Sequence, residues 1–201
     1  MLTLDHIAVA CTDLAAGVAW VEQTLGVPLQ AGGQHARYGT HNALLGLGDT
    51  YLEVIALDPG ATRTRPAWFG LDSFAGTPRC ANWICRADDL DAAITAAPTD
   101  TGLAVPLERG ALRWAITVPD DGSLPLQGAY PTLMRWADGT PHPTDTLTDQ
   151  GCALVGWQVQ HPQAAMVQAQ LALDDPRISF VAGAPGFTAT IRTPYGLRTL
   201  T

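Results

Sequence analysis

The sequence predicts an α+β protein in which paired β-α-β-β-β modules form a half-open barrel, followed by a C-terminal half-module of the same kind. A short strand, an acidic residue and an Ala-rich helical stretch occur in this order at residues 6–20 and again at residues 82–96. Short apolar strands separated by turn residues follow both stretches. Because about four strands accompany each helix, curved strands around a shared cavity with helices outside would bury both surfaces.

The first module is expected over residues 1–60. Its helix can begin after Thr12 or Asp13, both of which are good caps, and Gly26 suits the left-handed position past its end. One apolar stripe at helical spacing defines the helix: Leu14, Val18, Val21 and Leu25. Three strands are predicted to follow it: Val27–Gln30, His41–Leu47 and Tyr51–Leu57.

The second module is expected over residues 79–150, after a linker at 61–78. Asp88 or Asp89 can cap its shorter helix. The apolar stripe of this helix consists of Leu90, Ile94 and Ala97. The predicted strands are Val105–Glu108, Leu112–Val118 and Thr132–Ala137.

The C-terminal extension, residues 151–201, is predicted to add a strand that ends at Gln160, a helix and three further strands. Pro162 suits the first turn of that helix. The strands are expected in "ISFVA", "FTATIRT" and "LRTL". We expect the two modules and the extension to form a single globular unit.

The bulk composition limits the partners. The chain has 201 residues, a net charge of −8 and a pI near 4.8, which argues against nucleic-acid binding because phosphates need Lys and Arg. No apolar run reaches the ~18 residues of a membrane span, and "MLTLDHIAVA" lacks the basic start of a signal peptide. We expect a cytoplasmic protein with a small-molecule ligand, no nucleic-acid or membrane partner, and a homodimer as the assembly to consider.

Glu53 is the most informative single residue. It lies inside "YLEVIALDP", an apolar run that reads as a buried strand. An ionised carboxylate in such a run is costly unless something pairs with it. Aligning the two modules on Asp13 and Asp89 places His6 opposite Asn82, and aligning "YLEVI" with "TLMRW" places Glu53 opposite Met134.

The chain resembles the vicinal oxygen chelate superfamily, and within it the glyoxalase-like domain family. The resemblance rests on four segments: "LDHIAVACTDL", "GGQHARYGTHNALLGLGDTYLEVIALDP", "PTLMRWADGTPHP" and "TPYGLRTL". The superfamily includes glyoxalase I, extradiol dioxygenases and bleomycin-resistance proteins. The resemblance implies a barrel around one divalent metal that chelates two adjacent substrate oxygens, with His and Glu ligands on the first and fourth strands of the modules.

Carried over to this chain, the resemblance makes His6 and Glu53 both metal ligands and catalytic residues. Asn82 and Met134 are not usual ligands, so the second module leaves the metal site incomplete. His142, just past the fourth strand, is the candidate third ligand. Three roles stay open for His6 and Glu53: a buried hydrogen bond without metal, a metal site, and direct substrate contact or acid-base work.

Four residues are candidates for binding the substrate. Thr40 and Asn42 in "GTHN" can either form a turn or present hydrogen-bonding groups to a ligand. Arg113 and Trp136 lie in "LRWAIT" and "LMRWAD", where alternation puts Arg on one face and Trp on the other. One of the two faces must line the cavity. Trp68, in the linker, can fold over it.

Two functions follow from the resemblance. The first is an enzyme of lyase, isomerase or dioxygenase type that acts on a small oxygenated metabolite, with metal assistance at His6 and Glu53. The second is a non-catalytic binding or sequestration protein of the bleomycin-resistance type. Asn82 and Met134 favour the second function or an atypical form of the first.

Overall fold

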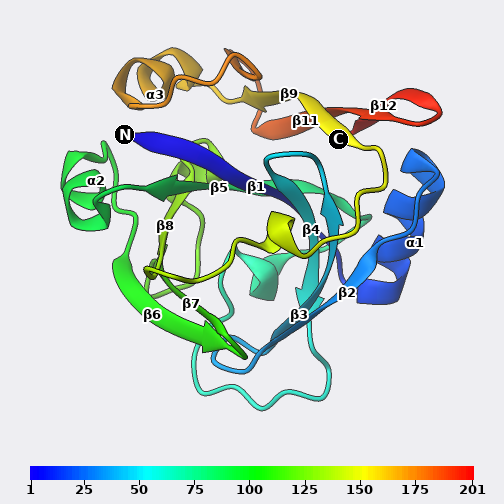
Figure 1. Ribbon diagram of the computed structural model, residues 1–201. Coiled ribbons are helices and arrows are strands. Elements are labelled where there is room, and N and C mark those ends of the chain that lie inside the picture. Colours follow the sequence, from blue (N-terminus) through cyan, green and yellow to red (C-terminus); the bar gives the residue numbers. More distant parts are fainter.

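The computed structural model describes residues 1–201 and contains two sheets and three α-helices, which confirms the α+β prediction (Figure 1). The larger sheet has eight strands in the order β2-β3-β4-β1-β5-β8-β7-β6. Its strands are β1 Leu2–Ala10, β2 Gln30–His35, β3 Thr40–Gly46, β4 Tyr51–Leu57, β5 Arg79–Ala87, β6 Leu103–Arg109, β7 Leu112–Val118 and β8 Thr132–Trp136. This sheet curls into the half-open barrel that the sequence predicts.

The two halves of the barrel have the same internal pairing. β1 pairs in parallel with β4, and β5 pairs in parallel with β8. The halves join where β1 and β5 run antiparallel to each other. In Figure 1, β2 to β4 lie on one side of the barrel and β6 to β8 on the other, so that both halves face a common interior.

The helices lie on the outside, and α1 and α2 begin where the sequence indicates, whereas α3 begins at Ala164, after Pro162. α1 spans Leu14–Leu25 and α2 spans Leu90–Ala96. The side chain of Asp13 accepts a hydrogen bond from the backbone N–H of Ala16, and Asp89 does the same for α2. Gly26 ends α1 with φ of 77°, a conformation that costs glycine little. None of the helices is long and apolar enough to cross a membrane.

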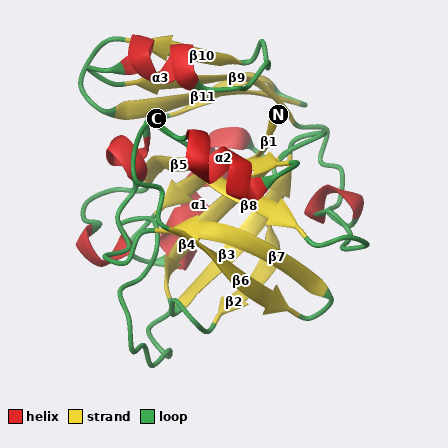
Figure 2. Cartoon of the chain, turned by 90° about the vertical axis from the view of Figure 1, so that its left-hand side faces the viewer, coloured by secondary structure: helices red, strands yellow, loops and turns green.

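The C-terminal extension repeats the β-α-β-β-β order and forms a second sheet. Its elements are β9 Ala153–Gln160, α3 Ala164–Gln170, β10 Ile178–Val181, β11 Gly186–Thr193 and β12 Gly196–Leu200. The strand order is β10-β9-β11-β12. Figure 2 shows this sheet stacked on the outer side of β1 and β5. Buried Trp83 and Trp157 belong to the apolar core between the two sheets. The division of the chain into two modules, a linker and an extension, with the boundaries given above, remains a prediction.

β2 is the one strand that the sequence misplaces. The expected strand was Val27–Gln30, but β2 runs over Gln30–His35 and includes the pair Gly32 and Gly33. Val27 is instead buried in the main core after the end of α1. The ladder between β2 and β3 shifts register between Ala31 and Gln34, so the glycines lie in a bulge. Glycines suggest a turn in a sequence, and here they mark a bulge.

Candidate functional site

A bulge in β1 brings two neighbouring ionisable residues to the same side of the barrel wall. The ladder between β1 and β5 shifts register between Leu4 and His6. Leu4 and Ile7 therefore both pack in the outer core, although an even alternation would put them on opposite faces. Asp5 and His6 lie between them, both buried and in direct contact.

Asp5 is the hub of this site, and the sequence analysis missed it. Its Oδ1 lies 2.7 Å from His6 Nδ1. Its Oδ2 accepts a hydrogen bond from Trp136 Nε1 at 2.9 Å and lies 3.2 Å from His142 Nε2 and 3.4 Å from Arg86 NH1. Strict alternation would have pointed Asp5 away from His6, so only knowledge of the bulge could have found it.

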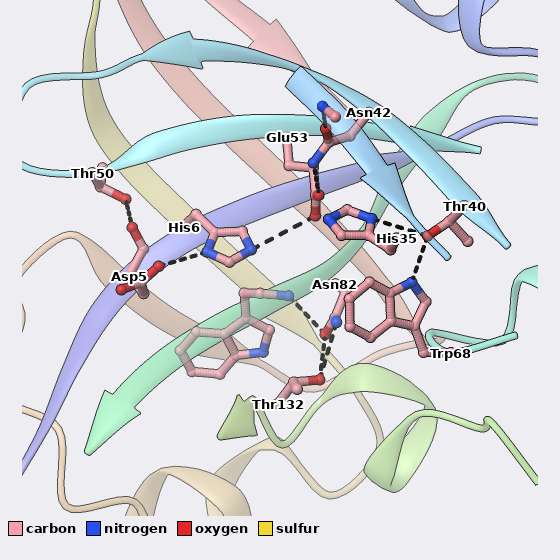
Figure 3. Close-up of polar contacts among 12 residues, drawn as sticks. Asp5, His6, His35, Thr40, Asn42, Thr50, Glu53, Trp68, Asn82 and Thr132 are labelled. Atoms are coloured by element: carbon pink, nitrogen blue, oxygen red, sulfur yellow. Dashed lines mark hydrogen bonds and ion pairs between the residues drawn. The ribbon is translucent and has the colours of Figure 1, made fainter. Parts of the chain in front are cut away.

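Glu53 faces His6, as expected from the first and fourth strands (Figure 3). Its Oε1 accepts a hydrogen bond of 2.5 Å from Asn42 Nδ2, and Asn42 Oδ1 accepts one from the backbone N–H of Gly33. The remaining oxygen, Oε2, lies 3.7 Å from His6 Nε2, which is too long for a hydrogen bond. His6 is thus held through Nδ1 and Glu53 through Oε1. His6 Nε2 and Glu53 Oε2 face each other without a hydrogen bond between them.

Burial and charge act against each other in this cluster. Burial alone lowers the pKa of His6, but Asp5 and Glu53 outweigh it and raise the pKa to about 9. Burial alone raises the pKa of Glu53, but His6 outweighs it and holds the pKa below its ordinary value. Burial alone would also raise the pKa of Asp5, but His142 and His6 hold it well below its usual range. At neutral pH the cluster holds an imidazolium between two carboxylates.

A second polar cluster closes one side of the site. Thr40 Oγ1 accepts a hydrogen bond from Trp68 Nε1 and lies 3.1 Å from His35 Nδ1. Trp68 does fold over the cavity, as the linker sequence suggests. Burial lowers the pKa of His35 to about 4, so this imidazole is neutral at neutral pH. The polar atoms of Thr40 and Asn42 are engaged inside the protein.

The second module supplies most of the apolar wall. The cavity between the modules has a volume of about 40 Å³. Its lining comprises His6, His35, Asn42, Leu44, Tyr51, Glu53, Trp68, Phe69, Arg109, Leu112, Trp114, Ile116, Met134, Trp136 and Pro143. Trp136 therefore lies where the sequence predicts, and His35 and Arg109 join the site without a sequence signal that pointed to them.

Arg113 lies on the opposite face from the cavity. The predicted alternation holds in β7, with Trp114 in the barrel and Arg113 on the outer surface, 3.0 Å from Glu108. A larger groove of about 620 Å³ lies against Arg113 on the outside of β6 to β8 and does not touch His6 or Glu53. A ligand beside His6 and Glu53 would not reach the Arg113 side chain.

A protein-family model described as a glyoxalase-like domain matches residues 4–173. The chain belongs to the glyoxalase-like domain family. This family is part of the vicinal oxygen chelate superfamily, as the sequence resemblance implied. None of the curated proteins matches the chain.

Solved structures resemble this glyoxalase-like protein at low sequence identity. A hypothetical protein from Staphylococcus aureus has a TM-score of 0.63 at 14% identity, with 92% of this chain and 88% of that chain covered. Methylmalonyl-CoA epimerase from Mycobacterium tuberculosis has a TM-score of 0.42 at 18% identity, covering 66% and 85% of the two chains. The Streptomyces coelicolor epimerase in complex with 2-nitronate-propionyl-CoA reaches 0.45 at 17% identity, covering 71% and 100%. The Staphylococcus likeness supports the fold alone, and the epimerase scores are too low to carry an argument.

The superfamily commonly binds a divalent metal, so the donor set of this chain matters. His6 Nε2 and Glu53 Oε2 are two donors that face each other. His142, the expected third ligand, has its ring nitrogens against Asp5 and Thr144. No group of three His, Cys, Asp or Glu side chains is arranged to hold a metal ion. The residues present therefore do not fit a metal held by protein ligands alone.

The second module carries a neutral pair at the position of His6 and Glu53. Glu53 pairs in the ladder with Ala8, two residues after His6, and Thr132 pairs with Ile84, two residues after Asn82. Thr132, and not Met134, is thus the counterpart of Glu53. The expected alignment was wrong by two residues, which keeps a side chain on the same face of the sheet. Asn82 Nδ2 donates to Thr132 Oγ1 at 3.0 Å.

Proposed function

We propose that this glyoxalase-like protein is an isomerase- or lyase-type enzyme that moves a proton on the carbon next to a carbonyl group of a small oxygenated metabolite. The observation that carries the proposal is the gap of 3.7 Å between His6 Nε2 and Glu53 Oε2. An acid and a base that are held separately, and are not hydrogen-bonded to each other, can each act on a molecule beside them.

In the proposed reaction, Glu53 Oε2 removes the proton and the electrons of the C–H bond pass to the carbonyl oxygen. The charged His6 donates a hydrogen bond to that oxygen and stabilises the enolate. The proton then returns from Glu53 to carbon. Asp5 keeps His6 charged and oriented, and Asn42 holds the other oxygen of Glu53. Thr40 acts indirectly, by holding Trp68 and His35 in the wall.

The size of the cavity limits what enters it. A volume of about 40 Å³ has room for only a small fragment of a ligand. The reacting carbonyl and its neighbouring atoms would occupy this space, against the rings of Trp114 and Trp136. Any larger part of the metabolite would lie toward the open side of the barrel.

Proton exchange in D₂O, followed by NMR on a panel of small oxo compounds, tests the proposal. Wild type should exchange the protons next to the carbonyl, and Glu53→Gln should lower the rate by about 10²- to 10⁴-fold, the usual contribution of a general base. Arg113→Gln, which changes an outward-facing residue, is the control and should exchange at the wild-type rate. Equal rates in Glu53→Gln and wild type, with both proteins folded, would remove Glu53 from the reaction.

Non-catalytic binding is the second candidate, and one observation favours it. The donors that could act on a ligand come almost entirely from the first module, while Trp114 and Trp136 of the second offer only an aromatic surface. Such a protein would bind members of the same panel without exchanging their protons. The cytoplasmic location and the homodimer remain predictions.

A further inference from the structure

Arg109 reaches from the second module to His35 and Asn42 of the first. It is the last residue of β6, an edge strand of the sheet, and it lies next to β2, the other edge strand. A Cβ atom on Gly33 would lie 2.7 Å from Arg109 Cδ. Glycine at position 33 therefore gives the arginine side chain room to pass over β2 and reach the cavity.

The guanidinium of Arg109 contacts only neutral acceptors. Its NH1 lies 3.2 Å from His35 Nε2 and 3.5 Å from Asn42 Oδ1. Three other arginines of the barrel have a carboxylate oxygen within 3.5 Å: Arg86, Arg113 and Arg135. Arg109 has no carboxylate partner, and its Nε and NH2 groups have no acceptor in the protein.

This free cation lies in the cavity that holds the reactive pair. Arg109 is partly buried and lines the same cavity as His6 and Glu53. The side chain of Asn42 contacts both Arg109 and Glu53. A partly desolvated guanidinium with free donors in fork geometry suits the two oxygens of a carboxylate.

We propose that Arg109 binds the carboxylate of the ligand, so that the substrate is a small oxo acid whose carbonyl lies next to, or one carbon away from, that carboxylate. The inference rests on the proposed function and names its substrate class. The free Nε and NH2 groups hold the two carboxylate oxygens, and the adjacent carbonyl reaches His6. The module that lacks the acid-base pair thus supplies the group that orients the substrate.

A pair of probes that differ only in charge tests the proposal. Pyruvate and pyruvamide have nearly the same shape, but only pyruvate is anionic. Binding measured by calorimetry or ligand-observed NMR should favour pyruvate about 10- to 100-fold in wild type, the range for hydrogen bonds to a charged group. Arg109→Gln should abolish the preference, and Arg109→Lys should keep part of it because the charge stays and the fork is lost. Arg113→Gln, with the same change of charge on the outer face, should behave as wild type.

A second readout needs no variant. The side-chain Nε resonance of Arg109 should shift on addition of pyruvate and stay unmoved on addition of pyruvamide or inorganic phosphate. Equal affinity of wild type for pyruvate and pyruvamide would overturn the proposal, as would a preference that persists in folded Arg109→Gln. A larger shift with phosphate than with pyruvate would also overturn the assignment to a carboxylate.

The two proposals fail in different ways. An Arg109-dependent preference for pyruvate without exchange of its methyl protons would support the anion site and count against the catalytic function. Exchange that depends on Glu53 but is equally fast for pyruvamide and in Arg109→Gln would support the catalytic function and overturn the role of Arg109.

Discussion

The two modules of the barrel place a polar pair at the same position of the same two strands, but with different chemistry. In the first module the pair is His6 and Glu53, charged and 3.7 Å apart. In the second it is Asn82 and Thr132, neutral and hydrogen-bonded at 3.0 Å. The neutral pair satisfies itself, whereas the charged pair needs Asp5 and Asn42 to hold it. The same position therefore holds a self-satisfied neutral pair in one module and, in the other, the charged pair that we propose to be reactive.

The difference follows from the cost of burying charge. An ion taken out of water loses several kcal/mol of solvation, which its partners must offset. The first module meets this cost with the bulge in β1, which adds the carboxylate of Asp5. The second module has the matching bulge between Asn82 and Cys80 of β5, but the residue in it is Ala81, which offers no charge. This module contributes apolar wall, the Trp136, His142 and Arg86 contacts to Asp5 and, across the edge, the guanidinium of Arg109.

Removing the carboxylate of Asp5 should show the largest effect. Asp5→Asn keeps the shape but presents an amide to the donors of His6 and Trp136, and it leaves the charge on His6 poorly compensated. We expect a loss of about 3–5 kcal/mol in the free energy of unfolding, measured by urea denaturation. Thr132→Val in the second module should lose only about 1–3 kcal/mol, because one buried amide N–H loses its acceptor. If Asp5→Asn costs no more than Thr132→Val, Asp5 is not the hub of the charged cluster.

Stability should also depend on pH through the first module. The folded pKa of His6, about 9, is above the unfolded value of 6.5, so its contribution is complete below pH 6.5 and is lost as pH rises toward 9. Between pH 6.5 and 8 the free energy of unfolding should fall by about 1.5 kcal/mol. Asp5 and Glu53 stay ionised across this window. His35 is neutral in the folded protein, but its unfolded form still binds protons near pH 6.5, so it offsets about 0.4 kcal/mol of the fall.

Two variants separate the contribution of His6 from the rest of the protein. Glu53→Gln removes a charge that raises the pKa of His6, so the decline between pH 6.5 and 8 should become shallower. Thr132→Val should leave the slope as in wild type. NMR titration of the His6 ring gives the same answer directly, and a pKa near 6.5 in wild type would contradict the charged cluster.

Two asparagines, one in each module, give the next test. Asn42 holds Glu53 in the first module, and Asn82 holds Thr132 in the second. Asn42→Ala should lower the proton-exchange rate about tenfold, or ~1.4 kcal/mol in activation free energy, because Glu53 loses its fixed orientation. Asn82→Ala should exchange at nearly the wild-type rate after correction for the folded fraction. Equal losses would mean that the second module contributes to the chemistry as much as the first.

Much of this comparison could be predicted from the sequence. The repeat, both helix caps and the bounds of α1 and β7 follow from periodicity and capping chemistry. The facing of His6 and Glu53 follows from the family resemblance. Two predictions failed because of β-bulges. The shift in β1 conceals Asp5, and the shift in β2 turns a glycine pair from an expected turn into strand.

The missed site residues depend on contacts between distant segments. Arg109 and His35 become neighbours because the edges β2 and β6 approach each other, and no local pattern in either strand indicates this. The alignment of Glu53 with Met134 failed for a related reason. The likeness of "YLEVI" to "TLMRW" does not fix the register between the modules. The ladder pairs make Thr132, two residues before Met134, the counterpart of Glu53.

The smallest effect is expected at Met134, which corresponds in the second module to Ile55 of the first module and not to Glu53. Both residues lie two positions after the polar partner on their strand, and both belong to the apolar lining inside the barrel. Met134→Leu and Ile55→Leu roughly conserve volume, so each should cost less than about 1.5 kcal/mol in the free energy of unfolding. Neither should change proton exchange or the preference for pyruvate, since no polar atom is removed. If Met134→Leu alone abolished exchange while Ile55→Leu did not, the thioether of Met134 would have a role in the reaction that its apolar surroundings do not suggest. The chemistry would then depend on the second module as well as on His6 and Glu53.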